Sequence, residues 1–192
     1  MAFPRATEIA QLLVKARVQP GDHVVDATVG NGHDTLFLAA CVGPAGRVDG
    51  FDIQGEAIMS ARARLGENTA VALHLRGHEE MAVVVPPGVK VVMFNLGYFP
   101  SGDRTVITRP ETTLPALEAA LNLLAPDGLL TVVVYPGHPG GAEEAERIES
   151  WLGRLSPERY RVIHYGASGR PGAATPPYLL AVERGKTEAA VD

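Results

Sequence analysis

Short apolar segments of strand length alternate with segments of helical character along almost the whole chain. Most of the apolar segments are bounded by Gly, Pro or polar residues and are followed by a stretch suited to a helix. Continuous apolar strands separated by helices are typical of a parallel sheet that is covered on both faces. The strands are expected at residues 23–27, 47–52, 70–75, 89–94, 129–135, 160–165 and 178–183.

The segments between these strands complete the predicted architecture. No helical segment separates the last two strands, so the final strand is expected to be antiparallel. We therefore predict an α/β fold of the Rossmann-like type: a seven-stranded, mostly parallel sheet with a final antiparallel strand and helices on both faces. Further helices are expected to about Val42 after the turn Asn31-Gly32, and at 55–65, 112–124 and 142–155, with a turn at Pro126-Asp127-Gly128.

The first residues of the chain are expected to form a helix within residues 1–20 that packs on the sheet. Its apolar residues fall at i, i+3, i+4 and i+7, the spacing of one helical face. They are Ile9, Leu12, Leu13 and Ala16.

A chain of 192 residues has the length of one domain, and we expect a single domain over residues 1–192 with a flexible tail at 185–192. No run of 18 apolar residues suggests a membrane span, and the N-terminal segment lacks an apolar stretch of signal-peptide length. These features indicate a cytoplasmic protein that makes no membrane contact.

The charge of the chain limits how it can bind nucleic acid. The formal net charge is −5, so the whole chain does not supply the basic field that extended non-specific binding needs. A local basic patch is conceivable late in the chain, but acidic residues alternate with the basic ones and favour a solvated mixed-charge face. The basic residues are Arg147, Arg154, Arg159, Arg161 and Arg170, and the acidic ones are Glu143, Glu144, Glu146, Glu149 and Glu158.

A glycine-containing turn follows the first strand, where open α/β sheets bind their ligands. Gly30 and Gly32 allow a sharp turn and a close approach of the backbone to a ligand. The third glycine of a dinucleotide fingerprint is absent, because position 35 is Thr. Asp26 is expected to aim a carboxylate where a pyrophosphate would lie, which disfavours NAD and suits the ammonium group of S-adenosylmethionine.

Two further loops extend this predicted cofactor site. Asp52 ends the second strand about twenty residues beyond Gly32, the place of a ribose-binding carboxylate, although an acidic residue there is also a common helix N-cap. Ile53 would lie against the adenine face. His78 follows the third strand and would line the adenine edge, with a histidine on a surface loop as the alternative.

The end of the fourth strand is the predicted site of the methyl acceptor. Asn95, Tyr98 and Asp103 converge there, and an amide oxygen can hold an amine by its N–H bonds while the lone pair stays free. The alternative is an ordinary Gly/Pro turn in which Asn95 satisfies backbone groups.

Five strings of the sequence together resemble one family. DATVGNGHDT, FDIQ, FNLGYFPSGD, VVYPGHPGG and PPYLLAVE are similar, in this order and over nearly the whole chain, to the MnmM/YtqB-type methyltransferases, long labelled rRNA methylases. The resemblance implies a class I methyltransferase that uses S-adenosylmethionine. It also implies a tRNA partner, bound at its anticodon region, in which the 5-aminomethyl group of a wobble (thio)uridine becomes 5-methylaminomethyl-2-thiouridine.

The resemblance also implies roles for individual residues. The family often has His at the position of Pro136, so that position is not essential to the chemistry, and the residues before Pro176-Pro177 depart from the family's Asn-rich run. Positions on the substrate side are Asn95, Leu96, Gly97, Tyr98, Tyr135 and His138. Positions in the cofactor site are Asp26, Thr28, Gly30, Asn31, Gly32, Asp34, Thr35, Asp52, Ile53, Gln54, His78, Asn95 and Leu96, the glycines and Thr28 being part of the first string.

The predicted chemistry needs few groups beyond those that hold the amine. Asp103 and His138 are the candidate proton acceptors, His138 having a structural alternative as a cap of the following helix, and Tyr135 would orient the amine. The histidines and the single cysteine show no ligand spacing, so no metal is expected.

Several alternatives remain open at this stage. An rRNA or a small-molecule amine is the second substrate, and a non-catalytic cofactor-binding module and a NAD-linked oxidoreductase are functions of other classes. Monomer and homodimer are both compatible with the sequence.

Overall fold

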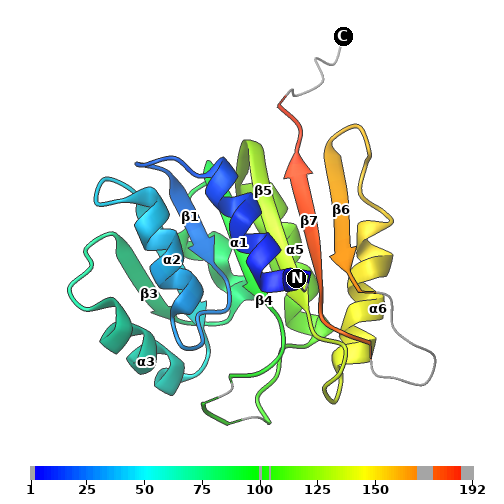
Figure 1. Ribbon diagram of the computed structural model, residues 1–192, viewed down its shortest axis with the longest axis horizontal. Helices are drawn as coiled ribbons and strands as arrows, with labels where there is room; N and C mark the ends of the chain where they lie inside the picture. Colours follow the sequence, from blue (N-terminus) through cyan, green and yellow to red (C-terminus); the bar gives the residue numbers. More distant parts are fainter. Residues whose placement is uncertain (1–2, 100, 104, 168–174, 187–192) are drawn as a thin grey trace.

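The described residues form seven strands in one sheet in a computed structural model, which describes residues 3–99, 101–103, 105–167 and 175–186. The strands are β1 (His23–Asp26), β2 (Arg47–Asp52), β3 (Val71–Leu75), β4 (Val89–Asn95), β5 (Leu124–Val134), β6 (Tyr160–Gly166) and β7 (Tyr178–Arg184). Their order is β3-β2-β1-β4-β5-β7-β6 (Figure 1).

The direction of the strands confirms the predicted sheet. The five strands from β3 to β5 pair in parallel, and β7 lies antiparallel between β5 and β6. The chain runs outward from β1 through β2 to β3, then returns to β4 on the other side of β1. This reversal opens a crevice at the carboxyl ends of β1 and β4, where such sheets bind ligands.

Helices cover both faces of the sheet, as expected. Ala10 of the first helix and Leu38 of the second are buried against one face, while Leu117 and Ile148 of two later helices are buried against the other (Figure 1). The 3-10 helix η1 and the short helix α4 were not predicted. The helical elements are α1 (Ala6–Arg17), α2 (His33–Val42), α3 (Gly55–Leu65), η1 (His78–Glu80), α4 (Met81–Val84), α5 (Pro110–Leu123) and α6 (Gly141–Leu152).

Helix α1 forms as predicted, and its predicted apolar face is confirmed in part, because Ile9 and Leu13 are half-buried against the core while Leu12 and Ala16 are exposed. Glu8 supports the start of the helix, because its carboxylate accepts the backbone N–H of Arg5 at 2.7 Å and the Arg5 guanidinium at 2.9 Å. The buried residues are Ala6, Ala10 and Val14, whereas Leu12 is 62% exposed. Small side chains at the contact let the helix axis lie close to β5 and β7, and tertiary packing rather than apolar spacing decides which face is inside.

The predicted turn at 126–128 lies within the bounds of β5. Between the pairs Val89–Leu124 and Val91–Leu129, β4 advances by two residues and β5 by five, so part of β5 bulges outward. Asp127 adopts a left-handed φ of 61° there, and its carboxylate pairs with Lys90 at 2.5 Å. The turn chemistry is therefore present as a bulge.

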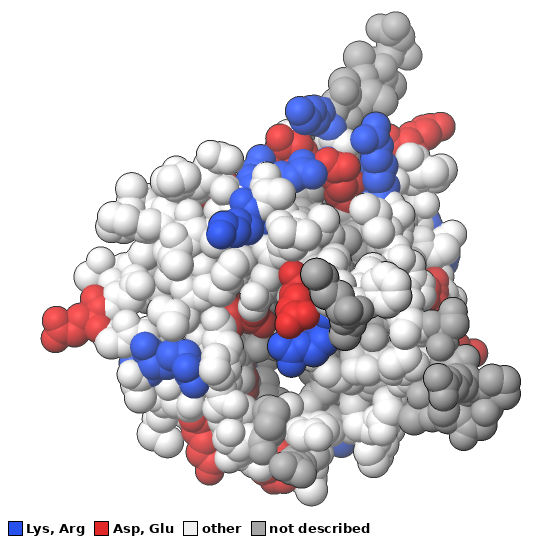
Figure 2. All heavy atoms as spheres, in the orientation of Figure 1, with Lys and Arg blue, Asp and Glu red and all other residues white. Residues whose placement is uncertain are grey.

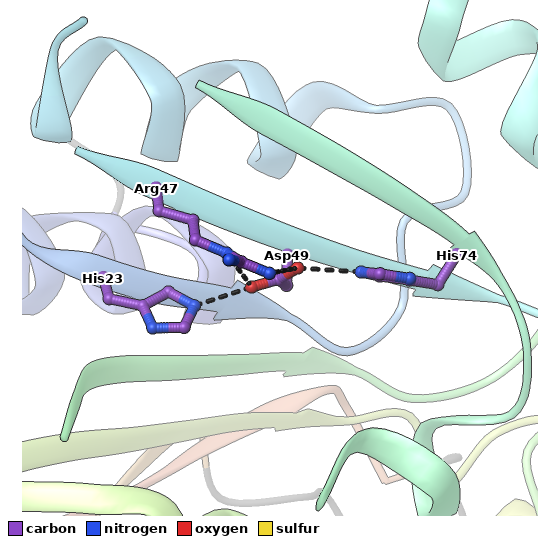
Figure 3. A network of polar contacts seen from close by, with 4 residues as sticks. All are labelled: His23, Arg47, Asp49 and His74. Carbon is purple, nitrogen blue, oxygen red and sulfur yellow. Dashed lines mark hydrogen bonds and ion pairs between the residues drawn. The ribbon is translucent and has the colours of Figure 1, made fainter. Parts of the chain in front are cut away.

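A buried carboxylate of β2 binds side chains of its two neighbouring strands, β1 and β3. Asp49 of β2 is fully buried and accepts contacts from His23 Nε2 at 2.6 Å, His74 Nε2 at 2.8 Å and Arg47 Nε at 2.7 Å (Figure 3). These hydrogen bonds outweigh the cost of burial and hold the pKa of the Asp49 carboxyl well below its usual range. The His74 ring also stacks on Phe51 at 4.7 Å between centroids.

Among the described residues no helix is long and apolar enough to cross a membrane. The predicted flexible tail at 185–192 lies mostly outside the described residues, as does Arg170 of the predicted mixed-charge face.

Candidate active site

A cavity of about 620 Å³ opens at the carboxyl ends of β1, β2 and β4, within the size range of small-molecule sites. It receives residues from α1, from the loops after β1 to β5, and from the segment before β7. Its lining contains most of the residues predicted for the site: Thr28, Gly30, Asn31, Asp34, Asp52, Ile53, Gln54, His78, Asn95, Leu96, Gly97, Tyr98, Tyr135 and His138.

Asp52 fixes the turn that follows β1. Its Oδ2 accepts the Gly30 N–H at 2.9 Å, and its Oδ1 accepts the Gln54 N–H at 2.9 Å. Gly30 has a φ of 51°, a conformation that glycine adopts at little cost. Both the ribose-binding and the helix-start interpretations of Asp52 are therefore compatible with its position, because the same carboxylate supports the α3 entry and lines the cavity.

Asp26 lies behind the cavity wall and does not line it. The side chain is 1% exposed, and its oxygens accept the Thr35 hydroxyl at 2.6 Å and the Thr28 N–H at 3.1 Å. Burial, together with repulsion from Asp34, raises the pKa of Asp26 to about 7. Asp26 and Thr35 are therefore buried outside the cavity lining in this structure, and their assignment to the cofactor site stays a prediction.

Gly32 also serves packing rather than ligand contact. Its φ is 75°, and a Cβ there would come within 2.8 Å of the Ala61 Cα on α3. Gly32 is buried and outside the cavity lining, so its assignment to the cofactor site also stays a prediction. Its side-chain-free backbone allows α2 and α3 to meet beside the site.

The carboxylate that faces the cavity on this side is Asp34, in the first turn of α2. Its Oδ1 accepts a hydrogen bond from Gln11 Nε2 at 2.7 Å, and its Oδ2 accepts one from Asn95 Nδ2. An ionised carboxylate only accepts, so it fixes the direction of the Asn95 amide. Asn95 Oδ1 is buried and has no hydrogen-bond partner among the described residues.

The backbone of Asn95 is held as firmly as its side chain. The Asn95 N–H donates to Thr28 Oγ1 at 2.7 Å, which joins the ends of β4 and β1. The alternative in which Asn95 only satisfies backbone groups of a turn does not describe this arrangement, because its side chain bonds to Asp34 and its buried Oδ1 has no partner among the described residues.

The opposite part of the cavity is suited to an aromatic base. Ile53 is 58% exposed at the rim, while His78 is only 8% exposed and tilts against Phe94 at 5.5 Å. Burial lowers the pKa of His78, which favours the neutral ring. His78 Nε2 has no partner among the described residues, so the surface-loop alternative for His78 is wrong.

Residues 97–99 and 106–108 of the loop between β4 and α5, here called the β4–α5 loop, line the other end of the cavity. Gly97 and Thr108 form its neck through two hydrogen bonds of 2.8 Å, and Tyr98 bridges to Ile107. Asp103 of this loop is exposed and outside the cavity lining, with its carboxylate bound to Thr105. These bonds lower the pKa of the Asp103 carboxyl. Its position outside the cavity lining gives no support to the predicted role as a proton acceptor.

His138 meets this loop from the segment after β5. Its ring lies edge-on to Tyr98, with centroids 6.2 Å apart. Its Nδ1 lies 2.9 Å from the Pro139 carbonyl oxygen, which can only accept, so the neutral ring carries its proton on Nδ1. Nε2 is then a bare acceptor, buried and without a partner among the described residues. The side chain does not cap α6.

Tyr135 lines the cavity near Asp34. Burial and repulsion from the Asp34 carboxylate raise the pKa of its hydroxyl, so the side chain stays a neutral donor.

The charged side chains gather away from the site. On the face shown in Figure 2, Lys and Arg lie among Asp and Glu where the C-terminal end of the chain emerges, at the far edge of the sheet from the cavity, and are scattered elsewhere. The predicted mixed-charge face on α6 departs from expectation at one residue, because Glu144 is 1% exposed.

Several lining residues had no signal in the sequence. They come from α1, from the loop after β3, from the end of the β4–α5 loop and from the start of α5, which approach the site only through tertiary packing. They are Thr7, Arg76, Thr108 and Thr112.

The site can hold a ligand that combines a cationic group with an aromatic base. Asp34 and Asp52 supply negative charge, and the unpartnered Asn95 Oδ1 and His78 Nε2 supply polar contacts. Among the described residues no group of His, Cys, Asp and Glu is arranged to hold a metal ion.

Comparisons with known proteins agree on one kind of molecule. The family model described as "Putative rRNA methylase" matches residues 48–183. The chain is 43% identical over 160 residues to an Arabidopsis thaliana protein named "tRNA (mnm(5)s(2)U34)-methyltransferase, chloroplastic". This alignment covers 77% of the chain and 58% of that protein, so the chain spans less than two thirds of its relative's length.

Two solved structures are similar over nearly their whole length. A protein of the same description as the family model, from Clostridium thermocellum, is 41% identical with a TM-score of 0.89, and the match covers 96% of this chain and 100% of that one. A Streptococcus mutans protein described as a "putative methyltransferase", in complex with SAH, is 31% identical with a TM-score of 0.86. That match covers 95% of this chain and 99% of the other.

Proposed function

This chain belongs to the rRNA methylase family, and from that membership we propose that it methylates tRNA with S-adenosylmethionine. The proposed acceptor is the 5-aminomethyl group of a wobble (thio)uridine, and the product is 5-methylaminomethyl-2-thiouridine. The name of the Arabidopsis relative favours tRNA over the rRNA of the family description. The observation that carries the proposal is the unpartnered Asn95 Oδ1 at the end of β4, whose direction Asp34 fixes.

The residues of the cavity fit S-adenosylmethionine. Asp34 and Asp52 suit its positive charges and its ribose hydroxyls, since carboxylates accept N–H and O–H donors. Ile53 offers an apolar surface to the adenine, and the orphaned His78 Nε2 offers a polar contact at the base's edge. When bound, the cofactor supplies an electrophilic methyl group on a sulfonium sulfur. A pyrophosphate-bearing cofactor such as NAD fits less well, because Asp34 would repel it.

Asn95 positions the acceptor amine in the proposed reaction. Its Oδ1 accepts one N–H of the neutral amine, which leaves the nitrogen lone pair free to form the new N–C bond as the S–C bond breaks. Asp34 acts on this step only through Asn95, by keeping the amide oxygen turned toward the amine. Holding two reactants in such an orientation contributes several kcal/mol to catalysis, on the order of 7–11 kcal/mol in the best cases.

His138 is the proposed proton acceptor. The amine gains a positive charge when the new bond forms and must lose one proton to give the neutral product. The Pro139 carbonyl holds the His138 proton on Nδ1, so the lone pair on the buried Nε2 is available to a proton from the ligand once the acceptor is bound beside Tyr98 and Gly97. Tyr135, kept protonated, donates a hydrogen bond that orients the groups around the amine.

The experiment that tests this function uses the purified protein and S-adenosylmethionine with an isotopically labelled methyl group. Three acceptors are compared: tRNA that carries 5-aminomethyl-2-thiouridine, ribosomal RNA, and a small primary amine. Mass spectrometry of the nucleosides is expected to find the label in one product of the tRNA, and Asn95→Ala is expected to reduce it strongly. Label in ribosomal RNA or in the small amine alone would overturn the tRNA assignment. Binding of SAH without transfer to any acceptor would favour a cofactor-binding module.

A further inference from the structure

A fully buried carboxylate, Glu144, lies just below the site and has no place in the reaction described so far. It stands in the first turn of α6 and is 1% exposed. Among the described residues no Lys or Arg pairs with it, and burial raises the pKa of its carboxyl. An apolar side chain of similar size would fill this volume without the cost of removing a carboxylate from water. The contacts that the Glu144 carboxylate makes must therefore account for its presence at this buried position.

Glu144 binds the neck of the β4–α5 loop. Its Oε2 accepts the Thr108 hydroxyl at 2.8 Å, and the same Thr108 oxygen accepts the Gly97 N–H at 2.8 Å. The Gly97 carbonyl oxygen in turn accepts the Thr108 N–H at 2.8 Å. Gly97 lies two residues after Asn95, so this chain of hydrogen bonds runs from α6 to the end of β4.

The second oxygen of Glu144 reaches a different element. Its Oε1 accepts the Thr113 hydroxyl on α5 at 2.6 Å. The carboxylate thus joins α6 to the loop and to the start of α5, more than thirty residues earlier in the sequence, and both hydroxyls donate to it.

The start of α6 also carries His138 close to this link. A Cβ on Gly141 would come within 2.9 Å of His138 Nε2 and 2.5 Å of the Tyr135 carbonyl oxygen, so the helix begins in direct contact with both. Helix α6 therefore contacts both the neck of the loop, through Glu144, and the proposed proton acceptor His138. A shift of α6 relative to the loop would separate His138 from Tyr98 and Gly97.

We propose that Glu144 is a positioning residue for methyl transfer: by accepting the Thr108 hydroxyl it holds the β4–α5 loop on α6, so that the loop and His138 meet at the acceptor end of the cavity. This inference rests on the proposed function. Glu144 acts through Thr108 and Gly97 and does not touch the ligand, because it is not among the residues that line the cavity.

The test compares two substitutions of Glu144 with a matched control. Glu144→Leu removes both hydrogen bonds, and Glu144→Gln keeps an amide oxygen for Thr108. The control Thr113→Val removes the other hydrogen bond of the same carboxylate and leaves the loop link in place. Three quantities are measured for each protein: SAH affinity, the single-turnover rate on tRNA that carries the aminomethyl base, and the hydrogen exchange of the Gly97 amide by NMR.

Glu144→Leu is expected to lower the single-turnover rate at least ~10-fold, the scale of one lost orienting hydrogen bond, and to speed Gly97 exchange by a similar factor. SAH affinity should change less than about threefold, because the cofactor side of the cavity is untouched. Glu144→Gln and Thr113→Val should keep the rate and the Gly97 protection within about threefold of wild type. Should Glu144→Leu not fold, Thr108→Val replaces it, since this change removes the hydroxyl that joins Glu144 to Gly97.

Three results would overturn the assignment. The first is a normal rate in folded Glu144→Leu or Thr108→Val, and the second is an equal loss in Thr113→Val, which would indicate a general structural role. The third is unchanged Gly97 exchange in the variants that break the link. If the wild-type protein transfers no methyl group to this tRNA, the proposed function fails, yet the exchange measurement still decides whether Glu144 holds the loop.

Discussion

Replacing Asp34 by Asn tests whether the direction of the Asn95 amide matters for catalysis. In the wild-type protein the Asp34 carboxylate accepts hydrogen bonds from Asn95 Nδ2 and from Gln11 Nε2. The substitution keeps the shape of the side chain and removes the charge. An amide at position 34 also donates, so it no longer forces the Asn95 oxygen toward the cavity.

The expected loss follows from the kind of hydrogen bond that is replaced. A hydrogen bond to a charged group contributes about 1.5–3 kcal/mol and a neutral one about 0.5–1.5 kcal/mol. The midpoints of these ranges differ by about 1.25 kcal/mol, which corresponds to about an eightfold lower rate. Asp34→Ala removes the bond entirely and should lower the rate further, by roughly 10- to 150-fold.

The assay is the single-turnover rate of methyl transfer at saturating S-adenosylmethionine, with SAH affinity measured separately by calorimetry. Gln11→Leu is the matched control, because it removes the neutral partner of the same carboxylate and leaves the Asn95 contact intact. It should cost no more than about threefold in rate. Equal losses in Gln11→Leu and Asp34→Asn, or a defect of Asp34→Asn that lies wholly in SAH affinity, would refute the positioning of Asn95 by Asp34.

Three other predictions concern the remaining carboxylates. Asp52→Ala should weaken SAH binding roughly 10- to 150-fold. It should also lower the melting temperature, because the Asp52 carboxylate accepts the backbone N–H groups of Gly30 and of Gln54 before α3. A lower melting temperature with unchanged SAH affinity would show that Asp52 is only a structural residue. Since the pKa of buried Asp26 is raised to about 7, the free energy of unfolding of the apo protein should fall as pH rises from about 4 to 7. Over the same range a cationic ligand should bind more tightly, and its binding should release a proton. Calorimetry in buffers of different ionisation enthalpy measures this release, and the same release in Asp26→Asn would contradict the assignment. The pKa of Asp49 is lowered, so the stabilisation that its carboxylate provides is present above the unfolded-state pKa of about 3.9 and is lost as pH falls below it. Asp49→Asn should lower the free energy of unfolding by about 3 kcal/mol at pH 7 and should make stability depend less on pH in the acid range. An unchanged curve of stability against pH would contradict the network in Figure 3.

Local sequence rules were sufficient for most of the fold. The bounds of β2 and α3 agree with the predicted ones, because continuous apolar runs and Gly/Pro turns report strand and helix directly. The antiparallel final strand followed from the missing helix before it. The location of the site followed as well, since parallel strands bring their carboxyl ends to one edge and the glycine turn lies at the reversal of strand order.

The sequence could not say which carboxylate faces the ligand. Asp26 and Asp34 lie eight residues apart around the same turn, and both were assigned to the cofactor site. Asp26 ends β1 with its side chain turned into the interior, where Thr35 and Thr28 satisfy it. Asp34 lies in the first turn of α2, where the helix presents it to the cavity. The orientation of each side chain follows from the register of β1 and the angle of α2, which no local pattern encodes.

The sequence also could not say which acidic residues of α6 are exposed and which are buried. Glu143 and Glu144 are neighbours in one polar helix, yet Glu143 is exposed and Glu144 is buried beneath the loop neck. Helical periodicity places the two side chains about 100° apart around α6. Only the packing of α5 and the β4–α5 loop on α6 decides which of them is buried. Asp103, by contrast, is exposed in that loop, bonded to Thr105 and outside the cavity.

By itself, the order of apolar and helical segments determined the sheet, its crevice and the residue types available there, because these depend on spacing along the chain. The tertiary structure alone decided that Gln11 supports Asp34, that Asp34 orients Asn95, and that Glu144 holds the neck of the loop beside His138. These contacts join residues more than twenty positions apart, and their formation depends on how whole helices pack on the sheet. Spacing along the chain carries no information about such distances.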